Sequence, residues 1–303
     1  MTRSLPRNVE ATRALAEELS VRYSREHGLN RQAFAIRLLI HLPRVANGDG
    51  NVDPQSAADE ALRLIETEEW ADEQQLREKW TVSLPQVDLA GTELVPLNDG
   101  DAREIFGSLH FLRSFRTGAQ YFGLRDARSG SLLSCCGVAP SRWQVVTDAL
   151  AKSLRIAPGE ILDLCRMYTL TGAPRNSISR LLRLLVNESA SWSAPAQLLT
   201  TVVDQNLGFT GSAYASANWP LLAEVEHLPY RYVDKRYRTA GQLFEQYRTM
   251  ESAVLAEKLG QSFQQSRGPL RRSLVFGTAL NKHFRRAVSR RADLPLLLSN
   301  PPA

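Results

Sequence analysis

The sequence predicts a mixed α/β protein in which helices cover both sides of a central mixed sheet. The order of the expected elements supports this prediction. From Pro85 onward, segments typical of strands alternate with segments typical of helices. Elements in such alternation bury their apolar faces most simply when helices pack on both faces of one sheet. The 303 residues, 43% apolar and 23% charged, are enough for one or two soluble domains.

The first 85 residues predict a helical accessory domain. Helix formers dominate residues 9–45, and the stretch 31–42 has a broad apolar face. Asp53 is expected to cap a further helix that has Pro54 in its first turn and runs to about Trp80. No pattern typical of a catalytic site occurs in this part of the sequence. The domain is therefore expected either to bind a partner or only to pack.

Residues 86–240 contain the predicted sheet. The strands are expected, in chain order, at 94–97, 120–125, 131–138, 161–170, 196–204 and 230–234. The helices between them are expected at 102–109, at 177–189 and in a short segment that carries Tyr214, Asn218 and Trp219. The turn at 126–130 joins the second and third strands into a hairpin. The unit from 161 to 204 is expected to form two parallel strands joined by a right-handed helical crossover.

The last segment, residues 241–303, predicts a basic helical extension. From residue 238 to the end, 11 Lys and Arg stand against 4 Asp and Glu, a balance of +7. The first 85 residues, with 11 against 14, have a balance of −3. Helices are expected at 241–260 and 273–291, the second with a basic face that would neutralise phosphates. DNA is therefore the expected partner, and a solvated helix face is the alternative. The candidate nucleic-acid-binding residues are Arg271, Arg272, Lys282, Arg285 and Arg286.

Cysteine usage and the lack of long apolar segments predict a cytoplasmic protein. The three cysteines, Cys135, Cys136 and Cys165, have no disulfide-framework spacing, which favours a reduced, intracellular protein. The N-terminus lacks the apolar core of a signal peptide. No apolar run approaches the roughly 18 residues that a membrane span needs, so no membrane association is expected. The metal requirement and the oligomeric state are left open.

The stretch Thr200–Trp219 has the parts of a small-molecule transfer site. An apolar strand ends on the carboxylate of Asp204, a loop with spaced glycines follows, and a short helix then carries Tyr214. Earlier in the chain, the loop Gly172–Ser179 leads from the strand 161–170 into a helix. Free N–H groups and the helix dipole favour an anion at such a helix start.

This layout, over about residues 90–238, resembles the GNAT acyltransferase superfamily. There, the loop after the fourth strand holds the diphosphate of coenzyme A, and a tyrosine after the fifth strand often protonates the leaving thiolate. The resemblance implies acetyl-CoA or another acyl-CoA as the cofactor and Tyr214 as the acid, since a tyrosine pKa near 10 suits a thiolate. The implied cofactor-binding residues are Arg175, Asn176, Ser177 and Ser179. The loop lacks the usual Gly-rich motif, so helix capping is its alternative role, and packing is the alternative for Tyr214.

Three segments within roughly residues 105–240 resemble the Mom DNA-modification family. They are Arg166–Ser179 with its P-R-N-x-x-S loop, the D-x-x-x-G-x-x-G-x-x-Y-x-S-x-N-W run from Asp204 to Trp219, and the aromatic segment Tyr230–Arg236. Members of this family are divergent GNAT-like proteins that alter adenine at N6 in DNA. The resemblance implies a transferase that modifies a nucleic-acid base outside the duplex stack.

The same resemblance implies roles for individual residues. Asp204 would accept or orient the proton of the amine, and His110 would contact the substrate or shuttle a proton. His110 lies where the family often carries a His-Tyr pair, although Phe111 here lacks the hydroxyl. The implied substrate-binding residues are Ser216, Asn218, Trp219, Tyr230 and Tyr232. Loop capping for Asp204, and packing for His110 and the aromatic residues, are the alternatives.

Two other functions also fit the sequence. A GNAT-fold N-acyltransferase acting on a small amine or an aminoacyl substrate would not bind duplex DNA, and its activity would be insensitive to salt. A non-catalytic DNA-binding protein on the same fold would keep DNA binding after Tyr214→Phe and Asp204→Asn. The first choice remains an enzyme, a GNAT-like acyltransferase-type transferase that modifies DNA.

Overall fold

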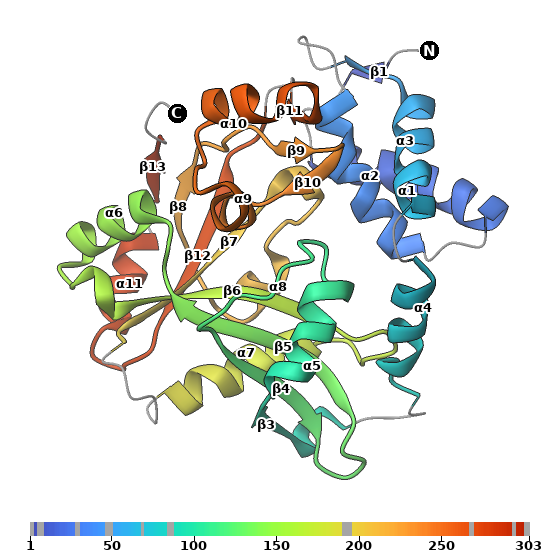
Figure 1. Ribbon diagram of the computed structural model, residues 1–303. Coiled ribbons are helices and arrows are strands. Elements are labelled where there is room, and N and C mark those ends of the chain that lie inside the picture. Colours follow the sequence, from blue (N-terminus) through green and yellow to red (C-terminus); the bar gives the residue numbers. More distant parts are fainter. Residues whose placement is uncertain are drawn as a thin grey trace.

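A central eight-stranded mixed sheet dominates the computed structural model, which describes residues 3–4, 9–27, 31–45, 51–67, 70–83, 88–189, 196–266, 270–292 and 295–299. The strand order is β13-β8-β12-β7-β6-β5-β4-β3 (Figure 1). The strands are β3 (Thr92–Pro96), β4 (Gln120–Asp126), β5 (Leu132–Pro140), β6 (Ile161–Thr169), β7 (Leu198–Val203), β8 (Leu221–Val225), β12 (Ser273–Ala279) and β13 (Leu296–Leu298). The mixed α/β class is confirmed, as are the β4–β5 hairpin and the parallel pairing of β6 with β7.

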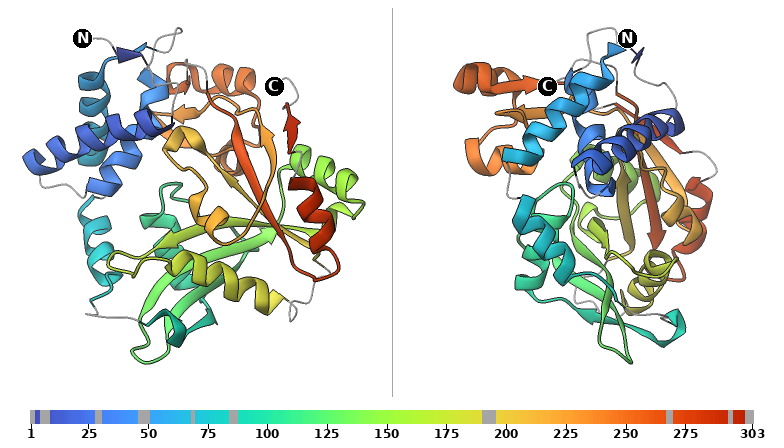
Figure 2. Two further views of the ribbon diagram at one scale, coloured as in Figure 1. Left: turned by 180° about the vertical axis from the view of Figure 1, so that it is seen from behind. Right: turned by 90° about the vertical axis from the view of Figure 1, so that its right-hand side faces the viewer.

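Helices cover both faces of this sheet. In Figure 1, α5 (Asp99–Glu104) lies in front of the strands, and the view from behind in Figure 2 shows α7 (Ser177–Glu188) and α8 (Ser212–Ser216) on the opposite face. A π-helical turn, η2 (Ile105–Leu109), continues α5. Further along the sheet, α6 (Gln144–Leu154) and α11 (Arg285–Ala292) share a hydrophobic cluster with β8 and β12. The sequence does not predict α6 or β8. No helix in the described part of the chain is long and apolar enough to cross a lipid bilayer.

A second, three-stranded sheet lies beside the N-terminal helices (Figure 1). Its order is β10-β9-β11, with β9 (Arg231–Val233), β10 (Arg236–Arg238) and β11 (Phe263–Gln265). The strand predicted at 230–234 is therefore present but belongs to this small sheet. Two helices, α9 (Ala240–Tyr247) and α10 (Ser252–Leu259), replace the single helix expected at 241–260.

The N-terminal helices share a hydrophobic cluster with this small sheet. The helices in this cluster are α1 (Val9–His27), α2 (Arg31–Val45) and α3 (Pro54–Thr67). A fourth helix, α4 (Trp70–Lys79), follows α3, and the two-residue strands β1 (Arg3–Ser4) and β2 (Asn51–Val52) accompany these helices. Two helices thus replace the one expected from Asp53 to Trp80. The hydroxyl of Tyr232 in β9 donates a hydrogen bond to the carbonyl of Ile40 in α2, at 2.8 Å. Residues 1–85 as a separate domain remain a prediction.

The predicted helix over 273–291 is wrong. Residues Ser273–Ala279 form β12, which lies between β7 and β8 inside the central sheet, and only α11 is helical. β-Branched Val275 suits a strand that is buried on both faces. Gly277 allows the neighbouring strands to lie close, because a Cβ there would meet the Leu222 side chain at 2.6 Å. Pairing along the sheet therefore overrides the helical pattern of this segment.

Strand β12 divides the predicted nucleic-acid-binding residues into two groups. Arg271 and Arg272 precede the strand, whereas Lys282, Arg285 and Arg286 follow it. The 7 residues of β12 span roughly 20 Å at about 3.3 Å per residue, so the two groups lie at its opposite ends. The second group is exposed. Arg271 and Arg272 therefore lie far from the three basic residues that follow β12, and the five do not form one continuous basic surface.

Candidate active site

The central sheet opens between β6 and β7. These parallel strands pair only from Ile161 to Asp163 on β6 and from Leu198 to Thr200 on β7. Beyond that point the strands separate, as Figure 1 shows. The separation begins next to an extra residue in β6, because the pairing of β5 with β6 shifts register at Cys165. Such a bulge bends a strand and increases its twist, and bulges are frequent beside active sites.

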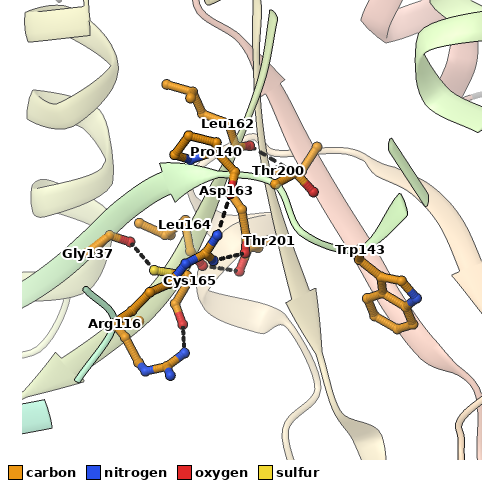
Figure 3. Close-up of polar contacts among 12 residues, drawn as sticks. Arg116, Gly137, Pro140, Trp143, Leu162, Asp163, Leu164, Cys165, Thr200 and Thr201 are labelled. Atoms are coloured by element: carbon orange, nitrogen blue, oxygen red, sulfur yellow. Dashed lines mark hydrogen bonds and ion pairs between the residues drawn. The ribbon is translucent and has the colours of Figure 1, made fainter. Parts of the chain in front are cut away.

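Two threonines of β7 bridge the start of this opening. The Thr200 hydroxyl donates to the carbonyl of Leu162 at 3.0 Å, and the Thr201 hydroxyl donates to the carbonyl of Leu164 at 3.1 Å (Figure 3). Side-chain donors thus replace backbone donors where the ladder ends. One residue further on, the Val202 side chain is 36% exposed although β7 is an inner strand of the sheet. Solvent therefore reaches β7 directly beyond the bridge.

Tyr214 lies between the separating strands. Its hydroxyl is 3.4 Å from the Thr201 hydroxyl and 3.9 Å from the sulfur of Met167 on β6. The helix that carries it, α8, directly follows Gly211, whose φ of 77° is in the left-handed region. A Cβ at Gly211 would lie 2.3 Å from the ring of Phe276, so only glycine lets α8 pack this closely. Burial raises the pKa of Tyr214 to about 12, and the hydroxyl therefore keeps its proton at neutral pH.

Asp163 is a candidate site residue that the sequence reasoning missed. Its Oδ2 forms an ion pair with Arg116 at 3.0 Å, drawn in Figure 3, and its side chain is 22% exposed. Burial raises the pKa of the Asp163 carboxyl, although the positive charge of Arg116 opposes the shift. Oδ1 has no hydrogen-bond donor among the residues that the structure describes. The signal in the sequence was a single acid within the apolar strand segment Ile161–Leu164.

Asp204, the predicted base, lies beyond the end of β7 in a fully bonded cluster. Its Oδ1 accepts the backbone N–H and the side-chain amide of Asn206, both at 2.9 Å. Its Oδ2 accepts a bond from Nε2 of His227 at 2.9 Å and another from the Tyr230 hydroxyl. Burial raises the pKa of Asp204, but these bonds and the charge of His227 outweigh it, so the pKa is lowered. A carboxylate bonded in this way is a weak base, and the geometry favours the capping alternative.

His227 completes this cluster as a cation. Its Nε2 faces Asp204, and its Nδ1 lies 2.6 Å from the carbonyl of Leu228. Both ring nitrogens therefore face acceptors, which only the protonated ring can satisfy with two donors. Burial lowers the pKa of His227, but the hydrogen bond and charge of Asp204 more than compensate and raise it. No ring nitrogen is left to act as a base.

His110, the second predicted catalytic residue, is buried and neutral. It is 5% exposed, packs against Phe106 and Phe111, and accepts a bond from the backbone N–H of Leu112 at 3.2 Å. Burial, together with the charge of Arg166, lowers its pKa to about 3. At neutral pH such a ring is far too weak a base to remove a proton, so its surroundings favour the packing role.

The predicted cofactor loop connects the end of β6 with α7. Asn176 precedes the helix with a φ of 68° and makes no side-chain cap, and both Arg175 and Asn176 are exposed. The Ser177 hydroxyl is instead buried and donates to the carbonyl of Pro174 at 2.6 Å. Ser179 is half-buried. The Ser177 N–H also donates to the carbonyl of Pro174, at 3.3 Å, so the loop leaves the N–H groups of Ile178 and Ser179 and the Arg175 side chain available.

The predicted aromatic stacking surface is buried. Trp219, Tyr230 and Tyr232 are 3%, 2% and 0% exposed, and all three belong to hydrophobic clusters. No base can stack on them in this arrangement. The two other predicted substrate residues, Ser216 and Asn218, are exposed at the end of α8. Burial raises the pKa of Tyr214 most, and the Asp163 carboxylate lies near enough for its charge to help raise it. The predicted substrate contacts, by contrast, are divided between buried and exposed positions.

Three solved structures illustrate which proteins are similar to this chain. Arabidopsis thaliana NAA60 in complex with acetyl-CoA is 10% identical, with a TM-score of 0.37 over 62% of this chain and 98% of that one. The ribosomal-protein-S5-alanine acetyltransferase from Vibrio fischeri is 8% identical, with a TM-score of 0.35 over 63% of this chain and 94% of that one. The GCN5-related N-acetyltransferase from Brucella melitensis is 11% identical, with a TM-score of 0.31 over 66% and 81%.

No protein-family model matches the sequence, and no curated protein matches it at a significant level. Likeness at the TM-scores above supports no conclusion about function. The functional proposals therefore rest on the residues of this chain.

Proposed function

We propose that this chain is a GNAT-type acyltransferase that moves an acyl group from a coenzyme A thioester to an amine. The observation that carries the proposal is the opening between β6 and β7, with the Tyr214 hydroxyl placed between the strands. The unpaired edge of β6 offers N–H and C=O groups to a linear, amide-containing ligand. The hydroxyl of Tyr214 already lies beside a sulfur atom, that of Met167, which suits a ligand whose reactive atom is sulfur.

Three features of the chain fit a coenzyme A thioester. From Leu164 to Thr169, the edge of β6 that faces β7 has no strand partner. Helix α7 has 12 residues and no side-chain cap, so the N–H groups of Ile178 and Ser179 in its first turn can bind a diphosphate. Arg175 and Asn176 stand exposed just before this helix, and Arg175 would add a charge-assisted bond. Bound there, an acyl-CoA would supply the activated acyl group.

Two side chains would control the protons. The Asp163 carboxylate would accept, at Oδ1, the proton that the amine loses as its bond to the acyl carbon forms, and the raised pKa makes this carboxylate a better base. Arg116 would hold the carboxylate in place. Tyr214 would donate a hydrogen bond to the sulfur as the C–S bond breaks. Because its pKa is about 12, Tyr214 stabilises the thiolate without giving up its proton, and solvent completes the thiol.

The acceptor that we propose first is an amine of a nucleic-acid base, the N6 amine of adenine in DNA, on the resemblance to the Mom family. The exposed basic residues Lys282, Arg285 and Arg286 support contact with phosphates. The second candidate is a small amine or an aminoacyl substrate. Two observations favour it, namely the burial of the aromatic residues Trp219 and Tyr230 and the division of the basic residues by β12.

The proposal is tested by incubating the purified chain with acetyl-CoA and, separately, DNA, RNA or a panel of small amines. Release of the free thiol reports transfer, and mass spectrometry of digested nucleosides reports base modification. We expect release with wild type, a strong loss with Asp163→Asn and Tyr214→Phe, and no loss with Asp148→Asn, which changes an exposed acid on α6. A new adenosine mass supports the first acceptor, and release with small amines alone supports the second. DNA binding without acetyl-CoA binding or turnover would contradict both and favour a non-catalytic DNA-binding protein.

A further inference from the structure

Two arginines of the small sheet lie directly opposite each other. The antiparallel pairing of β9 with β10 places Arg231 opposite Arg238. Directly opposed residues project from the same face of a sheet, where like charges destabilise the pair. Arg231 is only 7% exposed, and Arg238 is half-buried. Neither forms an ion pair with any carboxylate in the described part of the chain. Burying a cation without a counter-charge is costly, so this arrangement calls for a physical reason.

The donors around these arginines point to an anion. The Nε of Arg231 donates to the hydroxyl of Ser252 at 3.3 Å, and Ser252 is the first residue of α10. The residue before it, Glu251, makes no side-chain cap, so the first N–H groups of α10 have no side-chain acceptor. The Nε of Arg238 is buried and has no hydrogen-bond partner. Arg231 thus contacts the start of α10, the positive end of its helix dipole, and Arg238 lies opposite Arg231 on the same face of the sheet.

The acids of the same segment do not balance these charges. Glu245, Glu251 and Glu257 are all exposed, and none forms an ion pair with Arg231 or Arg238 among the residues described. Burial lowers the pKa of Arg231, the direction expected for a cation that lacks a counter-charge. On the third strand, Gln265 lies opposite Arg231 and presents a neutral amide to the same face. The site thus has several donors and a net charge near +2.

We propose that the face of β9 and β10 carrying Arg231 and Arg238, together with the start of α10, binds a phosphate group. A guanidinium matches the geometry of phosphate with two parallel bonds, and a phosphate monoester at neutral pH carries close to two negative charges. Both charges would be neutralised by the two arginines. The phosphate could belong to a small phosphate ester or to a nucleic-acid backbone, because both present anionic phosphate oxygens; a backbone diester carries one negative charge and would neutralise one of the two arginines. This inference does not depend on the proposed acyl transfer.

Thermal unfolding of the full chain in phosphate and in chloride, at equal ionic strength, tests the proposal. Binding to the folded state raises Tm, by roughly 5 °C when phosphate is near 100 times its Kd. For Arg238→Gln we expect two opposite effects. Its Tm in chloride rises because the repulsion with Arg231 is relieved, and the phosphate-dependent rise disappears. Arg231→Gln should lose the same response. Arg238→Lys, which keeps the charge but not the planar fork, should retain part of it.

The matched control is Lys258→Gln, which removes one positive charge near the other end of α10 and should keep the full phosphate response. Three results would overturn the proposal: no phosphate-dependent rise in wild type, a full rise in Arg238→Gln, or a loss in Lys258→Gln equal to that in Arg238→Gln. Competition separates the two sources. A nucleoside monophosphate that competes with phosphate, where an oligonucleotide does not, assigns the site to small esters. Competition by the oligonucleotide assigns it to the nucleic-acid backbone.

Discussion

Asp163 lies on β6 and Asp204 directly follows β7, and the surroundings of these two acids differ sharply. Asp163 has one charged partner, Arg116, and burial raises its pKa. Asp204 receives four hydrogen bonds, one of them from protonated His227, and its pKa is lowered. The comparison teaches that the more completely bonded carboxylate is the poorer base. Asp163 has the free oxygen and the raised pKa that proton transfer needs, whereas Asp204 holds together the end of β7.

The largest expected effect is the loss of catalytic activity when Asp163 is replaced. Asp163→Asn should lower kcat/KM by about 10²- to 10⁴-fold, because the variant has no carboxylate to accept the amine proton. Asp163→Asn also leaves Arg116 without its counter-charge, so thiol release is compared per folded molecule. The loss of turnover should far exceed the loss of folded protein that urea denaturation reports. A variant with normal turnover would remove Asp163 from the mechanism and return the choice of base to Asp204.

Asp204→Asn should act on stability instead. Breaking a buried ion pair leaves His227 without its counter-charge, so the free energy of unfolding should fall by about 3 kcal/mol. Urea denaturation gives this value, and turnover per folded molecule should stay unchanged. The exposed pair Arg125–Glu93 provides a control, since Glu93→Gln should cost less than about 1 kcal/mol. A stable but inactive Asp204→Asn variant would reverse the assignment of the two carboxylates.

Gly211→Ala should disturb the placement of Tyr214. The methyl group would meet Phe276 and the backbone would keep a positive φ, which together cost about 2 kcal/mol. Because α8 must move, turnover should fall as well. Gly159→Ala is the matched control, as a Cβ there meets nothing within 4 Å. Equal effects of the two substitutions would argue against close packing at Gly211.

The Asp204–His227 pair should give stability a specific pH dependence. The raised pKa of His227 means that its contribution is complete below the ordinary value of 6.5 and is lost as the pH rises through the folded pKa. The lowered pKa of Asp204 means that its contribution is present above 3.8 and is lost as the pH falls. Unfolding free energies near pH 5 should therefore exceed those near pH 9 by more in wild type than in His227→Gln. An identical difference in both proteins would show that the pair does not contribute.

The smallest effect expected concerns the bridge at the opening. Thr201→Val removes the hydroxyl that bonds to the carbonyl of Leu164 and lies near Tyr214, at a cost of about 1 kcal/mol. Chemical denaturation measures this cost. Thr210→Val, which removes a hydroxyl outside the opening, should cost less. A larger loss for Thr210→Val would mean that the threonine bridge does not stabilise the separating strands.

Much of the fold follows from local patterns in the sequence, whereas the site depends on long-range pairing. Strands such as β4 and β5 are predicted because apolar runs and the turn between them are local signals. Strand β12 is missed because its apolar residues also fit a helix face, and only pairing with β7 and β8 decides between the two. Tyr214 is found because Gly208 and Gly211 mark its loop, and both have positive φ angles.

Asp163 is missed for a related reason. Its partner Arg116 lies 47 positions earlier in the chain, and no local spacing links the two. The same holds for Asp204 and His227, 23 positions apart, whose contact turns a predicted base into a structural ion pair. Burial of Trp219, Tyr230 and Tyr232 likewise depends on elements that are distant in sequence. The sequence thus shows which chemical group a side chain carries. It does not show whether that group is free to react or to contact a substrate in the folded protein.

In the proposed function, the opening between β6 and β7 binds the acyl donor. Hydrogen exchange of the backbone amides, with and without acetyl-CoA, tests it most directly. The proposed function predicts slower exchange at residues 164–169 of β6 and at the first turn of α7, with little change in β12 on the far side of β7. Unchanged exchange at those amides in saturating acetyl-CoA, or protection confined to another part of the chain, would contradict it.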